Sequence, residues 1–206
     1  MFSYLYPVSL RKGLGSDTSF LELILFRNRL QLATKDVLYS DGDQYLPATV
    51  VCNHLNQFLP HAQHVLVLGT GLASMVQVLA KQGFRPQFTL VEKDKLILQW
   101  ALEFLPDPVS GNIEPICEDA AGFMQRNTAK YDLIFIDIFN NRTVPAFVFE
   151  LPFLTQCRDS LAPGGRLAFN YIVANEAEWE HVQHVFGTVF PEYKIVSRSI
   201  NKILIA

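Results

Sequence analysis

The sequence has few of the features that mark disulfide-bonded, nucleic-acid-binding or membrane-inserted proteins. Its 206 residues include three cysteines, Cys52, Cys117 and Cys157, with no C-x-x-C pair, so neither a disulfide framework nor a zinc site is indicated. The basic residues are scattered, and their longest cluster is Arg11-Lys12, which argues against nucleic-acid binding through a broad charged patch. No apolar run is long enough to span a bilayer, and the first residues lack a secretory signal. We therefore expect a cytoplasmic protein without a membrane partner.

The sequence does have enough apolar residues for a sizeable core. Half of the 206 residues are hydrophobic and the formal net charge is only -3, which is typical of one globular domain with a modest extension. Residues 1–60 are predicted to form the extension, with short strands at 20–26, 30–32 and 37–39 and a helix over 46–58 that Pro60 terminates. Residues 61–206 are predicted to form the main domain.

From residue 64 onward, apolar strands alternate with amphipathic helices. This pattern predicts a doubly wound, Rossmann-like α/β fold with a mostly parallel sheet. We expect strands at 65–68, 88–91, 113–116, 133–137 and 166–171, and helices at 73–82, 95–104, 120–125, 146–160 and 176–186. Residues 161–165 are predicted to be a turn with glycines at positive φ. Residues 193–198 and 202–205 flank a short turn and predict an antiparallel C-terminal hairpin, one strand of which runs against the parallel sheet.

The segment that leaves the first of these strands is rich in small residues. Gly69, Thr70 and Gly71 follow the strand and precede a helix, an arrangement that lets a ligand approach the backbone and the helix N-terminus. The alternative interpretation is that the two glycines only make a tight β–α turn.

Acidic residues follow the next two strands at the same expected edge. Glu92 lies at the second strand tip, where it can accept hydrogen bonds from ribose hydroxyls, while Asp94 is better placed to cap the next helix. Asp119, which precedes Ala120, is positioned to accept from an adenine amino group, although it is also a good N-cap. These two roles of Asp119 are compatible.

Asp137 follows the fourth strand and is the main candidate for chemistry. The strand delivers it to the carboxyl edge beside the switch point, where ligands bind in α/β folds. Partial burial would shift its pKa and suit it to orienting or deprotonating an amine, although a capping or turn-forming role stays open.

Taken together, these residues resemble a known family. The glycine turn, Glu92, Asp119, Asp137 and the run Pro163-Gly164-Gly165 occur in the order and spacing of the class I S-adenosylmethionine-dependent methyltransferase fold. Within that fold the sequence is similar to the spermidine synthase (polyamine aminopropyltransferase) family, and residues 40–45, which end in Tyr45, resemble the family's acid-plus-tyrosine stretch. The resemblance implies S-adenosylmethionine, or its decarboxylated form, as the cofactor. The residues expected to bind it are Gly69, Thr70, Gly71, Glu92, Lys93, Asp119, Ala120 and Asp137.

The same resemblance implies that Asp137 is the acid that handles the attacking amine. We expect Asn140 and Tyr45 to be weaker contributors to catalysis. Three polyamine-binding acids of the family are missing, because Leu72, Asn140 and Leu46-Pro47 stand at their positions. A cationic polyamine would be poorly compensated without them. We therefore expect methyl transfer to a small acceptor in preference to aminopropyl transfer. The alternatives are a polyamine aminopropyltransferase, a non-catalytic nucleoside-binding domain and, less favoured, an NAD-dependent dehydrogenase.

Other patterns in the sequence carry less weight. The pairs His61 and His64, and His181 and His184, have a spacing that can bind metal on a helix, but solvated surface residues explain them, and we expect no metal site. The apolar N-terminal strands offer a possible homodimer surface. The expected partner is a small-molecule acceptor.

Overall fold

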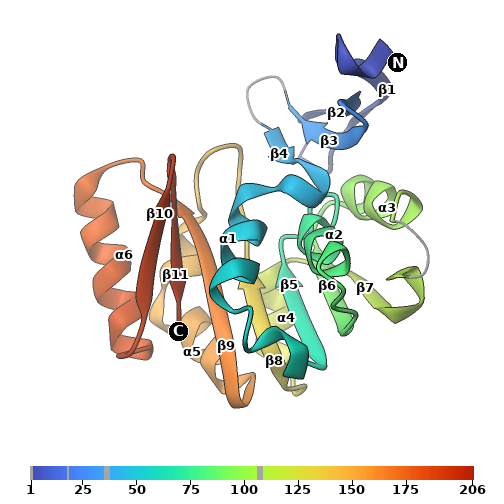
Figure 1. Cartoon of the computed structure of the whole chain (residues 1–206). Coiled ribbons are helices and arrows are strands. Elements are labelled where there is room, and N and C mark those ends of the chain that lie inside the picture. Colours follow the sequence, from blue (N-terminus) through green and yellow to red (C-terminus); the bar gives the residue numbers. More distant parts are fainter. Residues whose placement is uncertain (1, 18, 35–37, 106–108) are drawn as a thin grey trace.

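The computed structural model describes residues 2–17, 19–34, 38–105 and 109–206. The larger of its two sheets is mostly parallel, with a C-terminal antiparallel hairpin (Figure 1). This arrangement confirms the predicted doubly wound, Rossmann-like fold. In spatial order the sheet contains β10 (Lys194–Arg198), β11 (Asn201–Ile205), β9 (Leu161–Ile172), β8 (Tyr131–Ile136), β5 (His64–Leu68), β6 (Gln87–Glu92) and β7 (Ile113–Cys117).

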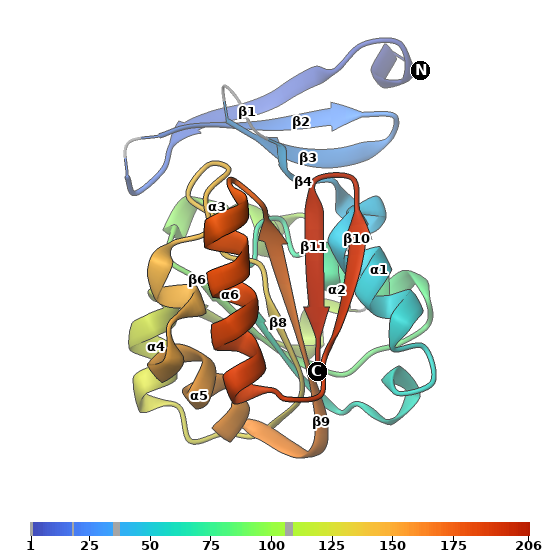
Figure 2. The same cartoon turned by 90° about the vertical axis from the view of Figure 1, so that its left-hand side faces the viewer.

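The central strands are apolar because helices cover both faces of the sheet. Val65, Leu66 and Leu68 of β5 are fully buried, although successive side chains point to opposite faces. On one face lie α1 (Leu46–His54), α2 (Ser74–Lys81) and α3 (Lys95–Glu103). On the other face lie α4 (Ala120–Arg126), α5 (Leu151–Asp159) and α6 (Glu176–Val189). Figure 2 shows α1 and α2 on one side of the sheet and α4, α5 and α6 on the other.

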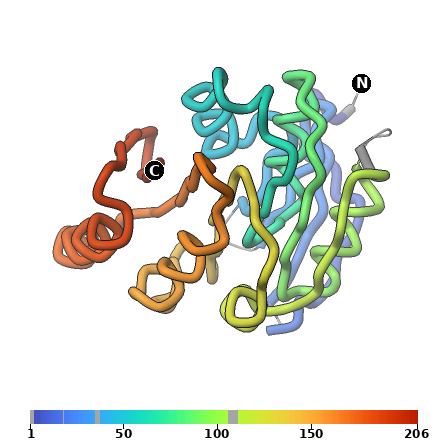
Figure 3. The backbone as a smooth tube through the Cα atoms, turned by 90° about the horizontal axis from the view of Figure 1, so that it is seen from below, coloured from blue at the N-terminus to red at the C-terminus, as the bar shows by residue number. Residues whose placement is uncertain are grey.

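The spatial order of the strands in the large sheet differs from their order in the sequence. β11 lies between β9 and β10 and is antiparallel to both, whereas β5 pairs in parallel with both β6 and β8. Seen from below, the C-terminal hairpin and α6 lie at one end and β7 at the other (Figure 3). The first strand of the domain, β5, therefore lies near the middle, where the strand order reverses.

The extension contains a four-stranded antiparallel sheet that covers the carboxyl edge of the large sheet (Figure 2). Leu21, Leu23 and Leu32 are buried and pack with Trp100 of α3. The sheet has one more strand than predicted, since residues 8–14 pair with the second strand. It contains β1 (Val8–Leu14), β2 (Phe20–Phe26), β3 (Arg29–Ala33) and β4 (Leu38–Ser40); Val37, expected in the last strand, lies outside the described residues.

Two predicted helices are shorter than expected, and a proline explains the second difference. The helix over 46–58 ends at His54, and Pro60 lies in the first turn of a separate 3₁₀ helix, Leu59–His61, where a missing N–H is tolerated. The helix over 146–160 is divided into a 3₁₀ turn, Ala146–Phe149, and α5. Pro152 lies in the first turn of α5, since an uninterrupted helix would require the N–H that proline lacks.

The predicted turn at 161–165 is instead an irregular part of β9. Leu161 pairs with Tyr131 and Arg166 pairs with Leu133, so the residues between them bulge from the ladder. Of the two glycines there, Gly164 has a positive φ, at 77°.

The packing of α1 concerns the predicted boundary between the extension and the main domain. α1, assigned by sequence to the extension, packs on the large sheet through residues such as Ala48 and Val51. The boundary near residue 60 stays a prediction. Among the described residues, no helix combines the length and the apolar character required to cross a bilayer.

Candidate active site

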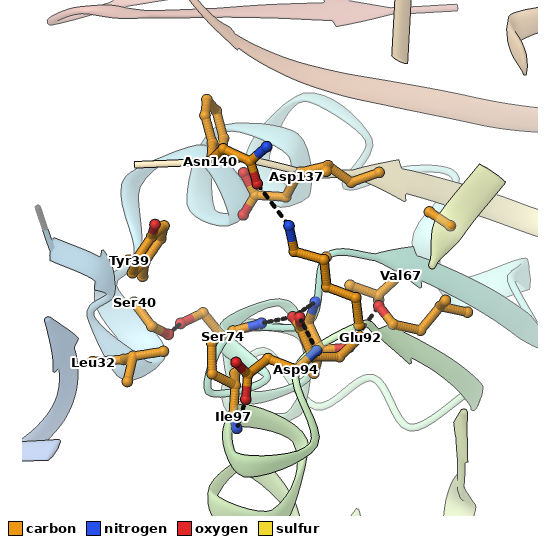
Figure 4. Close-up of a pocket in the computed structure, with 18 of the residues that line it drawn as sticks. Leu32, Tyr39, Ser40, Val67, Ser74, Glu92, Asp94, Ile97, Asp137 and Asn140 are labelled. Atoms are coloured by element: carbon orange, nitrogen blue, oxygen red, sulfur yellow. Dashed lines mark hydrogen bonds between the residues drawn. The ribbon is translucent and has the colours of Figure 1, made fainter. Parts of the chain in front are cut away.

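A cleft lies at the carboxyl edge of the large sheet, under the N-terminal sheet. About 970 Å³ of space free of protein atoms lies in it and in its opening to solvent. Asp137 and Asn140 lie on one wall, opposite Glu92 and Asp94 (Figure 4). The cleft is lined by all ten residues proposed from the sequence, namely Tyr45, Gly69, Thr70, Gly71, Glu92, Lys93, Asp119, Ala120, Asp137 and Asn140.

Glu92 holds the glycine loop through its carboxylate. The backbone N–H groups of Thr70 and Gly71 donate to Oε2 at 3.1 and 3.4 Å, and that of Asp94 donates to Oε1 at 3.1 Å. Burial raises the pKa of Glu92, and these three N–H groups oppose the rise. Glu92 therefore already has three backbone partners, and Oε1, which accepts from one of them, retains a lone pair for a ligand hydroxyl.

Asp94 performs the predicted capping role and has a second one. Its Oδ1 accepts from the N–H groups of Leu96 and Ile97 at the start of α3, at 2.8 and 3.1 Å. Its Oδ2 accepts from the backbone N–H of Ser16 at 2.5 Å. Because Ser16 belongs to the loop between β1 and β2, this contact ties the N-terminal sheet to the rim of the cleft.

Asp119 and Ala120 lie where β7 passes into α4. One oxygen of Asp119 accepts from the N–H of Ala121 at 2.9 Å, which is the N-cap interaction considered as its alternative role. Asp119 is otherwise exposed on the cleft wall, so its second oxygen is accessible to a ligand. A contact with adenine stays a prediction.

Asp137 is the best-positioned acid for proton transfer. Its Oδ1 accepts from the Tyr45 hydroxyl at 3.2 Å and from the Asn170 amide at 2.8 Å. Desolvation raises the pKa of Asp137 to about 6; the two hydrogen bonds lower it and the negative charge of Glu92 raises it further. Because burial holds the pKa of Tyr45 well above its ordinary value, that hydroxyl stays protonated and donates.

Asn140 and Lys93 meet across the opening of the cleft. The Lys93 ammonium donates to Oδ1 of Asn140 at 2.7 Å, which links the end of β6 to the loop after β8. Asn140 therefore faces the cleft, as the sequence suggested. The lysine brings a positive charge to the wall that carries Asp137.

The other two departures from the family pattern do not face the cleft. Leu72 is 2% exposed and packs with Leu21 and Trp100 in the cluster under the N-terminal sheet. Leu46 is partly exposed and Pro47 is buried at the start of α1, and neither lines the cleft. Of the three departures, the one at Asn140 thus changes the surface that a substrate would meet.

Several residues of this site were missed from the sequence. Asn170 is fully buried in β9, and only its proximity to Asp137 reveals a role. Tyr39 and Ser40 of β4 also line the cleft, and the Tyr39 hydroxyl accepts from the backbone N–H of Asn141 at 2.8 Å. The Ser40 and Ser74 hydroxyls are 2.5 Å apart. A contact between β4 and the cleft has no local sequence signal, because it depends on how the N-terminal sheet packs.

The described residues contain no group of three or more His, Cys, Asp or Glu side chains arranged to hold a metal ion. The polar side chains that line the cleft carry carboxylate, amide, hydroxyl and ammonium groups.

The strand order and this cleft define the class of protein: a Rossmann-like α/β domain with its site at the carboxyl edge of the sheet. The sequence matches the spermine/spermidine synthase domain over residues 49–199. The chain belongs to this family.

Individual relatives agree with the family assignment. The chain is 26% identical over 155 residues to a polyamine aminopropyltransferase of Vibrio vulnificus (strain CMCP6), covering 72% of this chain and 52% of the relative. It is 24% identical over 193 residues to spermidine synthase 1 of Hyoscyamus niger, covering 90% of this chain and 57% of the relative. The chain thus spans about half the length of these curated relatives.

A solved structure shows the same fold. A probable spermidine synthase from Corynebacterium glutamicum ATCC 13032 superposes with a TM-score of 0.82 at 19% sequence identity, covering 95% of this chain and 79% of that one. Fold likeness at this identity reports architecture, and the family match carries the assignment.

These findings overturn the expectation of methyl transfer to a small acceptor. The matched family and the relatives are spermidine synthases and polyamine aminopropyltransferases, so the interpretation placed second from the sequence is the better one. The physical reason for the error lies at Leu72 and Leu46-Pro47. Apolar residues argue against a cationic substrate only where they line its binding site, and none of these three lines the cleft.

Proposed function

We propose that this chain transfers an aminopropyl group from decarboxylated S-adenosylmethionine to an amine acceptor. The proposal rests on the recessed Asp137, held by Tyr45 and Asn170 in a cleft shared with Glu92 and Asp119. Membership of the spermine/spermidine synthase domain family supports this reaction over others that an acid in a nucleoside cleft could assist.

The nucleoside end of the cleft suits the adenosyl part of that substrate. Glu92 retains acceptor capacity for ribose hydroxyls, and Asp119 has an oxygen left for an exocyclic amino group. Gly69, Thr70 and Gly71 form the adjoining wall. When bound, the substrate supplies a sulfonium whose aminopropyl carbon is open to attack by an amine.

The role of Asp137 is to hold and accept a proton. An amine is a nucleophile only when its nitrogen lone pair is free, so an ammonium acceptor must first lose a proton. With a pKa of about 6, the Asp137 carboxylate is ionised at neutral pH and can attract the ammonium and take the proton. The nitrogen–carbon bond then forms as the carbon–sulfur bond breaks, with its electron pair moving to sulfur and methylthioadenosine leaving.

The reaction can be tested directly with purified protein. Decarboxylated S-adenosylmethionine plus putrescine should give methylthioadenosine and spermidine in equal amounts, measured by chromatography with mass detection. S-adenosylmethionine plus putrescine is the matched control for methyl transfer. Loss of the base should lower turnover by roughly a hundredfold or more in Asp137→Asn, while calorimetry with methylthioadenosine shows nucleoside binding retained.

Two outcomes would count against the proposal. One is methylated putrescine without spermidine. The other is tight methylthioadenosine binding with no turnover of putrescine or of longer and shorter amines, since that pattern describes a nucleoside-binding module. The expectations of a possible homodimer and of no nucleic-acid partner stay predictions.

A further inference from the structure

A chain of side-chain amides runs from Asp137 to the C-terminal hairpin. Asn170 of β9 donates through Nδ2 to Oδ1 of Asp137 at 2.8 Å. Its own Oδ1 accepts from Nδ2 of Asn201 at 2.9 Å. Asn201 is the first residue of β11, which lies beside β9 in the sheet (Figure 1). Asn170 is fully buried, and its amide also interacts with the Tyr45 hydroxyl, so protein groups surround an amide that water does not reach.

The amide of Asn170 has two possible orientations, and they affect Asp137 in opposite ways. In the observed orientation an N–H faces the carboxylate and stabilises its charge. If the amide were inverted, its oxygen would face the carboxylate, which would be tolerated only if Asp137 were protonated. With its own amide oriented as in the structure, Asn201 donates to Oδ1 of Asn170 and so favours the orientation of Asn170 seen here.

We propose that Asn201 is a positioning residue for Asp137, acting through the amide of Asn170. This inference rests on the proposed function, in which Asp137 accepts a proton. It assigns a role in that step to a residue outside the cleft. Asn201 does not line the cleft and would touch neither substrate. Its effect on the acid is therefore indirect.

Among the described residues, few charged or titratable groups lie near the hydrogen-bonded side chains of Asp137, Asn170 and Asn201. The effect of Asn201 on Asp137 can therefore be tested specifically. Asp137 is faced by the hydroxyl of Tyr45, which precedes α1, and by the carboxylate of Glu92 on β6. Lys93 lies on the same cleft and is bonded to Asn140. At the hairpin, Arg198 is paired with Asn201 across the ladder and donates to the Ser197 carbonyl, and Lys202 donates to the Ser197 hydroxyl.

The variant Asn201→Leu replaces the donor by an apolar side chain of similar size. The carbonyl of Asn170 then loses its partner in a buried place, and inversion or withdrawal of the amide removes the donor from Asp137. We expect the pKa of Asp137 to rise by half to one unit, roughly a three- to tenfold gain in proton affinity. Asn201→Ser restores a hydroxyl donor and should recover part of the original value.

Carboxyl carbon NMR measures this pKa without requiring turnover, with Asp137→Asn used to assign the resonance. Lys202→Leu is the matched control, since it makes the same change one residue later on β11 and should leave the titration of Asp137 in place. If Asn201→Leu fails to fold, Asn201→Ala should raise the pKa in the same direction.

The outcomes separate this inference from the proposed function. Equal titration of Asp137 in Asn201→Leu and Lys202→Leu, or no recovery in Asn201→Ser, overturns the role of Asn201. If the titration shifts but the protein turns over neither putrescine nor longer and shorter amines, the proposed reaction is overturned and the role of Asn201 still holds. When both hold, the acid limb of the activity profile should move to higher pH together with the NMR titration.

Discussion

Gly69 lies directly against the backbone of Asp137. A Cβ at position 69 would come within 2.3 Å of the Asp137 carbonyl oxygen, and Gly69 adopts a φ of 85°. The glycine that looked from the sequence like a ligand-contact residue is thus also required by the close approach of two chain segments. Gly69 therefore helps to set the position of Asp137, the acid of the proposed reaction.

We expect Gly69→Ala to be strongly destabilising and to displace Asp137. The unfavourable φ and the backbone overlap act together, and a loss of roughly 2 to 3 kcal/mol in the free energy of unfolding is reasonable. Gly83→Ala is the matched control, because Gly83 has a φ of 89° and a Cβ there would meet nothing within 4 Å. Urea denaturation should show a loss of roughly 1 to 2 kcal/mol for the control, the cost of a Cβ at positive φ alone. Equal losses in the two variants would mean that the contact with Asp137 is unimportant.

Asp137 should also make stability depend on pH. Its pKa is about 6 in the folded protein against an ordinary value of 3.8, so the folded state binds the proton more tightly than the unfolded chain. The free energy of unfolding therefore contains a favourable contribution below about pH 4 that is lost as pH rises through 6. A shift of this size corresponds to at most about 3 kcal/mol, and less where water in the cleft reaches the carboxylate.

Asp137→Asn removes the ionisation while keeping the shape of the side chain. We expect its melting temperature to exceed that of the unmodified protein at pH 7 by more than it does at pH 4. Calorimetric melting across this range measures the difference. Asp159→Asn, which makes the same substitution at an exposed acid, is the matched control. A difference independent of pH would contradict the elevated pKa of Asp137.

The positions of the main strands were predictable because burial on both faces requires continuous apolar runs. Residues 65–68 and 133–136 are such runs, and both are central strands. β1 was not recognised, because Arg11, Lys12 and Gly13 interrupt its apolar residues and its register shifts between Ser9 and Arg11. An exposed strand of this kind lacks the alternation on which recognition depends.

The side-chain directions in the glycine loop could not be predicted. Gly69, Gly71 and Ala73 all have positive φ, so neither helical nor strand periodicity applies between β5 and α2. As a result Leu72 points into the apolar cluster under the N-terminal sheet, and its replacement of an acid is uninformative about the substrate. The contribution of Asn170 could not be predicted either, since the sequence does not show which side chain a polar residue in a central strand will contact.

The burial of Leu72 gives a direct test of that explanation. Leu72→Asp would place a carboxylate among Leu21, Leu23 and Trp100, where no partner is available in the cluster, so we expect a loss of at least roughly 3 kcal/mol in stability. Leu72→Met conserves volume and should cost less than about 1.5 kcal/mol. Thermal unfolding compares the two. If Leu72→Asp were as stable as Leu72→Met and turned over putrescine faster, the side chain would have to reach the cleft after all.

Lys93 is expected to restrict which amines the cleft accepts. Its ammonium lies beside Asn140 on the wall that carries Asp137, so it repels the second ammonium of a diamine more than the neutral tail of a monoamine. Lys93→Met keeps the aliphatic stem and removes the charge. We expect kcat/KM for putrescine relative to n-butylamine to rise roughly two- to fivefold, which is the size of an exposed charge interaction.

Lys95→Met serves as the comparison for Lys93→Met. Lys95 is an exposed lysine at the start of α3 that does not line the cleft, and its removal changes the net charge by the same amount. Initial rates at several salt concentrations should show the gain in Lys93→Met shrinking as salt rises, because screening already weakens the repulsion in the unmodified protein. An unchanged diamine-to-monoamine ratio in Lys93→Met, or the same rise in Lys95→Met, would show that the lysine at position 93 does not select the acceptor.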